Sequence, residues 1–233
     1  MENRGGGSIS ILHPPSSILH PPSSPPLPFL RYDAGVPPDA DYLSPYLTAA
    51  RQHGGGFGSL LWASAVTQGA RFDALARLRS PKGLSVLDVG CGRADFLDFC
   101  IARDVAPADY VGIEAVPALA DAAVAKRLPN VTITRADFVQ QPLAMFVAAD
   151  LVLFSGSLNT LAPAQFYATL QRAFEATADA LVFNFLCAPG LAASSYLHWH
   201  RVADVLSFAR TLSPNVAHLT DYLDGDASIA ISK

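Results

Sequence analysis

Two glycines and two acidic residues near position 90 have the types and spacing to bind a nucleoside. The segment VLDVGCGRAD, residues 86–95, places Gly90 and Gly92 one residue apart after an apolar run that ends in Asp88. Glycines at such a bend let a ligand approach the backbone closely. A dinucleotide fingerprint has a third glycine where Asp95 stands, and its pyrophosphate rests on the following helix. A carboxylate there repels a phosphate, so the spacing favours a nucleoside without phosphates.

Two more acidic residues follow apolar segments of strand length. Glu114 ends DYVGIE, about 20 residues after the glycine bend, where a carboxylate can accept hydrogen bonds from both ribose hydroxyls. Asp137 follows VTITRA, where a side chain could meet an adenine amino group. S-adenosylmethionine, which carries an ammonium, a sulfonium and a carboxylate but no phosphate, suits this set. A nicotinamide-dependent oxidoreductase would have to tolerate Asp95.

The elements that position these residues predict an α/β fold. Apolar segments expected to be strands are residues 85–90, 109–114, 131–137, 150–155, 180–186, 216–223 and 227–232. Expected helices are 95–103, 117–126, 164–177 and 201–212. Near-continuous apolar strands with helical crossovers predict a mostly parallel sheet with helices on both faces. The short DGDA link predicts that the last two strands pair as an antiparallel hairpin. Ligands of such sheets lie beyond the carboxyl ends of the strands.

The first 80 residues divide into two regions. Residues 1–30 contain ILHPPSS twice in tandem, and proline removes backbone donors, so a disordered, polyproline-leaning tail is expected. A proline motif for a partner protein is the alternative. Residues 39–80 show helical periodicity and predict a lid of two helices, although packing on the sheet is equally compatible. Residues 81–233 form the predicted ligand-binding α/β domain.

Composition limits the partners and the compartment. The 233 residues carry a formal net charge of −4 without a run of Lys and Arg, which argues against a nucleic-acid partner. The three cysteines lack CxxC spacing and are expected to be reduced thiols. No apolar run is long enough to span a bilayer, and the N-terminus lacks a charged region followed by an apolar core. A cytoplasmic protein without a membrane partner is expected, and the oligomeric state does not follow from the sequence.

The chain resembles the class I S-adenosylmethionine-dependent methyltransferases. The resemblance rests on VLDVGCGRA, on GIE at the second strand, on AD at 136–137 and on DLVLFSGSLNTL at the fourth strand. It covers about residues 52–233 and is strongest to small bacterial enzymes with FNFL and DVLSFARTLSP. Ala94 departs from the family turn, which has its third glycine there. The resemblance implies a Rossmann-like seven-stranded fold, S-adenosylmethionine as cofactor and O- or N-methylation of a small organic acceptor in specialised-metabolite biosynthesis. A non-catalytic partner that binds the cofactor is the alternative.

The same resemblance assigns roles to individual residues. Asp88 would orient the ammonium, Glu114 the ribose and Asp137 the adenine, while Ser155 and Gly156 would lie under the sulfonium and face the acceptor. Gln68 and Arg71 would reach the cofactor carboxylate, unless they are solvated surface residues. The expected cofactor site comprises Gln68, Arg71, Asp88, Gly90, Cys91, Gly92, Glu114, Ala115, Asp137, Phe138, Ser155 and Gly156. In isolation, Asp88 could instead cap the turn, and the favoured role for Asp95 is a favourable charge at a helix start.

Candidate catalytic residues follow the fifth strand. Methyl transfer from a sulfonium depends mainly on alignment, and a base is needed only when the acceptor keeps a proton. YLHWHRVAD offers Tyr196, His198 and His200, and either histidine could act as a base with an unperturbed pKa near 6.5. Packing or surface roles are the alternative for both. No carboxylate or cysteine near them has metal-ligand spacing, so no metal site is expected.

The segment after the fourth strand narrows the acceptor class. SGSLNT lacks the Asn/Asp-Pro-Pro-aromatic signature of enzymes that methylate exocyclic base nitrogens, and it lacks the aspartate that metal-dependent catechol methylation requires. The aromatic residues Tyr42, Tyr46, Phe57 and Trp62 of the expected lid fit a small organic acceptor. Each of them could instead be a core residue.

Overall fold

One seven-stranded sheet forms the centre of the described chain. The computed structural model describes residues 42–192 and 194–233, so the predicted tail lies outside the described residues. The strand order is β3-β2-β1-β4-β5-β7-β6, with only β7 antiparallel to its two neighbours. The strands are β1 (Ser85–Val89), β2 (Asp109–Glu114), β3 (Val131–Arg135), β4 (Leu151–Phe154), β5 (Ala180–Leu186), β6 (Val216–Leu219) and β7 (Asp226–Ser232). The predicted fold class and the C-terminal hairpin are confirmed.

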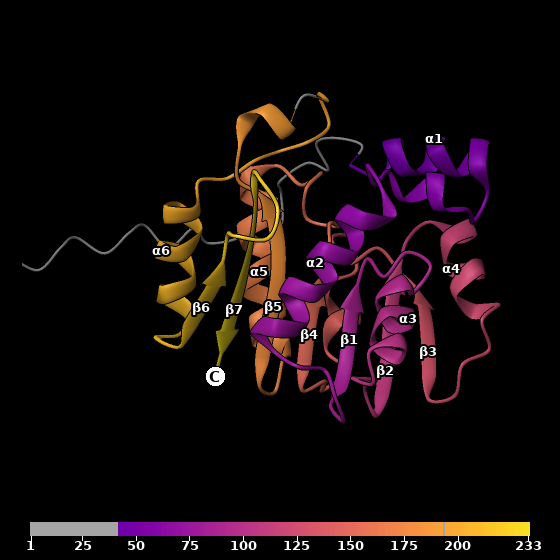
Figure 1. Cartoon of the computed structure of the whole chain (residues 1–233), viewed down its shortest axis with the longest axis horizontal. Coiled ribbons are helices and arrows are strands. Elements are labelled where there is room, and N and C mark those ends of the chain that lie inside the picture. Colours follow the sequence, from indigo (N-terminus) through magenta and orange to yellow (C-terminus); the bar gives the residue numbers. More distant parts are fainter. Residues whose placement is uncertain (1–41, 193) are drawn as a thin grey trace, which may run out of the picture. The chain divides into compact units, whose positions relative to one another are not determined.

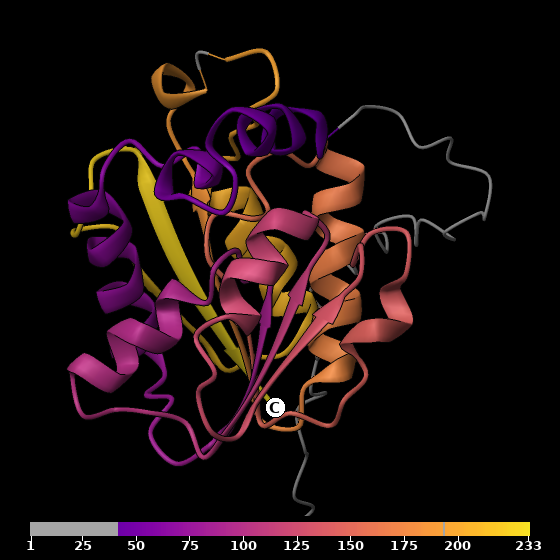
Figure 2. The same cartoon turned by 90° about the vertical axis from the view of Figure 1, so that its right-hand side faces the viewer.

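Helices cover both faces of this sheet (Figures 1 and 2). Helices α2 (Ala65–Leu78), α3 (Asp95–Ala102) and α4 (Pro117–Val124) contribute side chains to the apolar core on one face. Helices α5 (Pro163–Ala176) and α6 (Val202–Leu212) pack on the other. The remaining elements are α1 (Ser44–His53) and the short 3-10 helices η1 (Phe57–Leu60), η2 (Pro142–Met145) and η3 (Pro189–Leu191).

Alternation along the strands divides the core between the two faces. In β1, Val86 packs with the α2 and α3 side, whereas Leu87 and Val89 pack with the α5 and α6 side. Asp88 points to the same face as Val86 because side chains alternate along a strand. A strand that is apolar on both faces therefore carries one buried carboxylate next to the glycine bend.

Local sequence explains where several elements begin and end. Pro117 and Pro163 are the first residues of α4 and α5, where a missing N–H costs nothing. Ser64 caps α2, because its side chain accepts a hydrogen bond from the Thr67 amide. Strand β6 ends at Leu219, earlier than predicted. The residues after it leave the sheet, and the Tyr222 hydroxyl forms hydrogen bonds with the side chains of Asp226 and Ser228 in β7.

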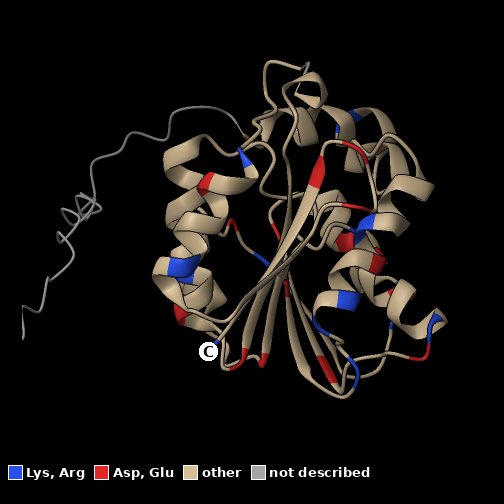
Figure 3. Cartoon of the chain, turned by 60° about the vertical axis from the view of Figure 1, so that its left-hand side comes forward, with Lys and Arg blue, Asp and Glu red and all other residues tan. Residues whose placement is uncertain are grey.

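The strand order reverses between β1 and β4, which makes the carboxyl ends of these strands the place for a ligand. In Figure 1, helix α1 lies on the side of the strands' carboxyl ends, above α4 and β3, while α2 runs along the sheet face. Charged side chains of one sign do not gather in one place in the view of Figure 3. Lys and Arg are distributed over several helices and interleaved with Asp and Glu. Among the described residues, no helix is both long and apolar enough to cross a membrane.

The glycine bend after β1 requires glycine for two reasons at Gly90. Its φ is +74°, in the left-handed region that side chains disfavour. A Cβ there would lie 2.4 Å from the Cβ of Ser157, which is far below contact distance. Gly83 has nearly the same φ, +73°, but a Cβ on it would meet nothing within 4 Å.

Gly83 therefore serves as a matched control for Gly90. We expect Gly83→Ala to lower the free energy of unfolding by about 1 kcal/mol through backbone strain alone. Gly90→Ala should lower it by about 2–4 kcal/mol, because overpacking adds to the same strain. Urea unfolding of both variants measures the difference. Equal losses would show that the contact with Ser157 relaxes without cost.

Candidate functional site

A cavity of about 240 Å³ opens at the carboxyl ends of the strands, where the sequence placed the ligand. One part of its wall is formed by the glycine bend and the end of β2, with Gly90, Gly92, Glu114, Ala115 and Phe138. Arg71 of α2, Leu186 of β5, and Leu191 and Tyr196 after β5 also line the cavity. The cavity therefore brings the predicted cofactor residues together with apolar groups from the second half of the sheet.

Glu114 fixes the shape of the cavity wall at the glycine bend. Its Oε2 accepts a hydrogen bond from the Gly92 amide at 2.8 Å, and its Oε1 accepts one from the Val116 amide at 2.7 Å. The residue is only 6% exposed, and this burial raises the pKa of its carboxyl group, against the lowering effect of the backbone N–H donors. A carboxylate has about four acceptor positions, so both oxygens can still accept hydrogen bonds from a ligand.

Asp88 lies under the bend in a more enclosed setting. Its Oδ2 accepts a hydrogen bond from the Tyr110 hydroxyl at 2.5 Å, so it does not cap the turn. Burial raises the pKa of this carboxyl group to about 7, although the Tyr110 hydrogen bond opposes the shift. Asp88 lines a small side pocket that continues from the main cavity and that also contains Gln68 and Cys91.

Ser155 lies between the two spaces. It lines both the main cavity and the side pocket, and its Oγ is buried without a hydrogen-bond partner among the described residues. A buried hydroxyl without a partner loses hydrogen-bond energy that a ligand atom could restore. Gly156 follows in the wall, and its amide donates to Asn184 Oδ1 at 2.8 Å.

Asp95 is the first residue of α3 and leaves the N-cap position to Ala94, whose φ is +56°. Its carboxylate lies 3.2 Å from Lys126 Nζ and 3.4 Å from Arg93 Nε, and Gln68 Nε2 donates to it at 3.5 Å. A negative charge in the first turn favours the helix, as expected, although its side chain makes no capping hydrogen bond.

The structure places Asp137 beside the cavity and not in its wall. Its Oδ2 accepts a hydrogen bond from Tyr42 at 2.6 Å, while Oδ1 accepts from the amides of Val139 and Gln140. Phe138, the next residue, lines the cavity instead. Of the four aromatic residues expected in the lid, Tyr42, Tyr46 and Trp62 line the cavity and Phe57 does not.

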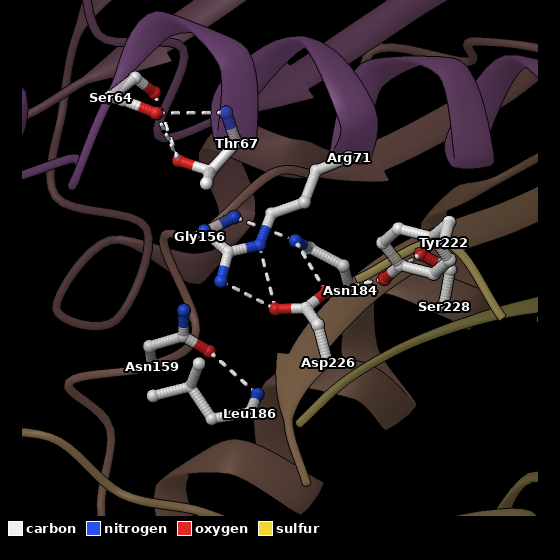
Figure 4. Close-up of polar contacts among 10 residues, drawn as sticks. All are labelled: Ser64, Thr67, Arg71, Gly156, Asn159, Asn184, Leu186, Tyr222, Asp226 and Ser228. Carbon is white, nitrogen blue, oxygen red and sulfur yellow. Dashed lines mark hydrogen bonds and ion pairs between the residues drawn. The ribbon is translucent and has the colours of Figure 1, made fainter. Parts of the chain in front are cut away.

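The two residues expected at the cofactor carboxylate are separated by the structure. Gln68 faces the side pocket with Asp88, but Arg71 lines the main cavity and forms an ion pair with Asp226 at the start of β7 (Figure 4). Arg71 Nε donates to Asp226 Oδ2 at 2.6 Å. The other oxygen of Asp226 accepts from the hydroxyl of Tyr222 and, at 3.4 Å, from Asn184.

The candidate catalytic residues occupy different environments. Tyr196 lines the cavity, but neither His198 nor His200 does. His200 is buried and stacks on Phe166, with ring centroids 3.9 Å apart. Burial, with a smaller effect from His198, lowers its pKa to about 4, so its ring is neutral near pH 7. His200 thus has the packing role that the sequence left open, and it does not line the cavity.

Sequence reasoning missed the polar group formed by Asn184, Tyr222, Asp226 and Ser228. Asn184 is the one polar residue in the buried strand β5, and this isolated amide was the sequence feature that could have indicated a buried polar group. Asp226 lay in a segment interpreted only as a hairpin turn. Its pairing with Arg71 spans 155 residues of sequence, which no local pattern predicts.

A model of the methyltransferase-domain family matches residues 65–215, more than half of the chain. The chain belongs to the S-adenosylmethionine-dependent methyltransferases. The match includes the glycine bend, Glu114 and Asp137. A comparison with curated protein sequences finds no match.

Solved structures with the same fold include two bound to the cofactor or its product. Magnesium protoporphyrin IX methyltransferase from Synechocystis PCC 6803, with bound SAM, is 14% identical, with a TM-score of 0.57 over 81% of this chain and 97% of that one. The DhpI–SAH complex is 16% identical, with a TM-score of 0.58 over 81% and 93%. The apo methyltransferase SibL is 19% identical, with a TM-score of 0.57 over 76% and 57%. At these identities the likeness shows the shared fold.

The residues present in this methyltransferase fit S-adenosylmethionine. The close approach at Gly90, the two available oxygens of Glu114 and the unpartnered Oγ of Ser155 all face the same connected space. No described lining residue of the main cavity other than Glu114 is a carboxylate. Among the described residues, no group of three or more His, Cys, Asp or Glu is placed to hold a metal ion.

The buried Asp88 carboxyl group makes stability depend on pH in a defined direction. Because its pKa is raised above 3.8 in the folded state, its contribution to stability is full at low pH and is lost as pH rises through about 7. Between pH 5 and pH 8 the wild type should lose on the order of 2 kcal/mol more unfolding free energy than Asp88→Asn. Asparagine keeps an oxygen for the Tyr110 hydroxyl but does not titrate.

Urea unfolding of the wild type and of Asp88→Asn at several pH values measures this effect. Subtracting one unfolding free energy from the other removes the contribution of groups that titrate in both proteins. If the gap between the two stays constant from pH 5 to pH 8, Asp88 is already ionised in the folded protein.

Proposed function

We propose that this methyltransferase transfers a methyl group from S-adenosylmethionine to an oxygen or nitrogen atom of a small organic acceptor in specialised-metabolite biosynthesis. The observation that carries the proposal is the single cavity with two chemically different parts. One part of its wall has the glycine bend and the buried Glu114, and another part has the apolar side chains of Leu186 and Leu197. Aromatic and aliphatic walls are typical of sites for small organic molecules.

Individual residues would hold the cofactor in this arrangement. We assign the ribose hydroxyls to Glu114, whose oxygens are already fixed by two backbone amides. The side pocket with Asp88 and Gln68 suits the ammonium end, because a cation favours the ionised form of a carboxyl group whose pKa is near 7. Ser155 and Gly156 would lie at the junction, where the acceptor meets the reacting methyl group.

Catalysis would depend on alignment and exclusion of water. S-adenosylmethionine supplies an activated methyl group, and the protein holds the acceptor in line with it. Tyr46 and Tyr196 line the cavity, and burial raises the pKa of Tyr46, so this hydroxyl stays protonated and can donate hydrogen bonds to a ligand. An acceptor that is already deprotonated in solution, or one whose nucleophilic atom carries no proton, needs no general base here.

Glu114→Gln tests the cofactor site directly. The amide keeps the size of the side chain but loses the charge, so we expect S-adenosylmethionine and S-adenosylhomocysteine to bind more weakly by about 1–3 kcal/mol. Isothermal titration calorimetry measures both ligands. Asp109→Asn, at the exposed start of the same strand, removes an equal charge away from the cavity and should leave both affinities unchanged. Unchanged binding to a folded Glu114→Gln variant would remove Glu114 from the site.

A further inference from the structure

Arg71 is held by a strand that is distant from Glu114 in the sheet. Its partner Asp226 pairs in register with Leu186, the last residue of β5. In the sheet order, β7 is four strand positions from β2, which corresponds to roughly 19 Å between strand axes. Arg71 lines the main cavity but not the side pocket that contains Gln68 and Asp88. The side pocket is the space assigned above to the cofactor ammonium, so Arg71 is available to the acceptor.

One edge of the Arg71 guanidinium group remains available to a ligand. Nε and Nη2 lie 2.6 Å and 2.5 Å from the same oxygen of Asp226. A guanidinium group has five N–H donors, so the Nη1 group and the second hydrogen of Nη2 are not used by this pair. The Arg71 side chain is 11% exposed and lines the cavity, whereas the Asp226 side chain is fully buried behind it. A ligand in the cavity meets the donor and not the carboxylate.

The surroundings of this edge favour a flat apolar molecule. The Arg71 guanidinium carbon lies 4.8 Å from the centre of the Trp62 ring, which also forms part of the wall. Leu186 and Tyr196 line the same cavity. Glu114, the carboxylate among the described residues of the cavity wall, ends β2, four strand positions from the β7 strand that holds Asp226. An ammonium group would find no partner beside Arg71, while an anionic oxygen pair matches the planar donor edge.

We propose, on the basis of the methyltransferase function above, that the acceptor carries a carboxylate on a flat apolar body and that the free edge of Arg71 binds this carboxylate. Asp226 holds the guanidinium in place, with Tyr222 and Asn184 fixing Asp226 from behind (Figure 4). Trp62 and Leu186 contact the apolar body. The sequence resemblance placed Arg71 at the cofactor, so this inference moves it to the acceptor.

Matched ligand pairs test the inference without knowledge of the natural acceptor. Benzoate, trans-cinnamate and 2-naphthoate are titrated against the S-adenosylhomocysteine-loaded full chain, each beside its primary amide, with ligand-observed NMR as the readout. We expect the wild type to bind at least one carboxylate about tenfold more tightly than its amide. The double variant Arg71→Gln/Asp226→Asn, which removes both charges and leaves no unpaired buried ion, should lose this preference and keep its S-adenosylhomocysteine affinity.

Arg77→Gln is the control variant, since Arg77 is exposed on the same helix and the substitution changes the charge equally. It should retain the carboxylate preference. Absence of a preference in the wild type for all three pairs overturns the inference. So does a double variant that keeps the preference, or one whose S-adenosylhomocysteine binding weakens tenfold, because Arg71 would then serve the cofactor. Wild type that fails to bind S-adenosylhomocysteine refutes the proposed function itself.

Discussion

The buried carboxylate of Glu114 is the interaction on which the cavity depends. It joins two turns that are far apart in sequence, the glycine bend after β1 and the start of α4 after β2, by accepting one backbone amide from each. Backbone amides at such turns have no ladder partner, and a buried carboxylate satisfies them at the cost of its own desolvation. The turns are thus fixed before any ligand arrives, and this part of the cavity wall is a preorganised surface.

The fold could be predicted from the sequence because its determinants are local. Apolar strands separated by helical crossovers specify the parallel sheet, and the short link before β7 specifies the hairpin. The glycine bend and the strand-end position of Glu114 also follow from spacing alone. The positions of Asp137 and His200 did not, because hydrogen bonds to Tyr42 and stacking on Phe166 depend on how distant segments pack.

The polar groups under the cavity form two separate systems with different origins. Asp88 and Tyr110 come from neighbouring parallel strands and lie two register positions apart, so their hydrogen bond is diagonal across the strand pair. Arg71, Asp226 and Asn184 come from α2, β7 and β5, and only tertiary structure brings them together. The first system borders the side pocket, and Arg71 of the second borders the main cavity. Gln68 and Arg71, which are one turn apart on α2, therefore line different spaces.

The ion pair between Arg71 and Asp226 also anchors α2 to the sheet. Moving α2 away from the sheet would leave the buried carboxylate of Asp226 without its cation, which is energetically costly, so α2 is held firmly on the sheet. Helix α1 is separated from α2 by three consecutive glycines, Gly54 to Gly56, by η1 and by residues 61–64. Ser59 of η1 donates hydrogen bonds to the carbonyl groups of Ala49 and Gly54, and a Cβ on Gly55 would lie 2.7 Å from the Ala118 carbonyl oxygen of α4. The absence of side chains in the triple glycine therefore lets the backbone after α1 pack closely against α4, the helix that follows the Glu114 strand.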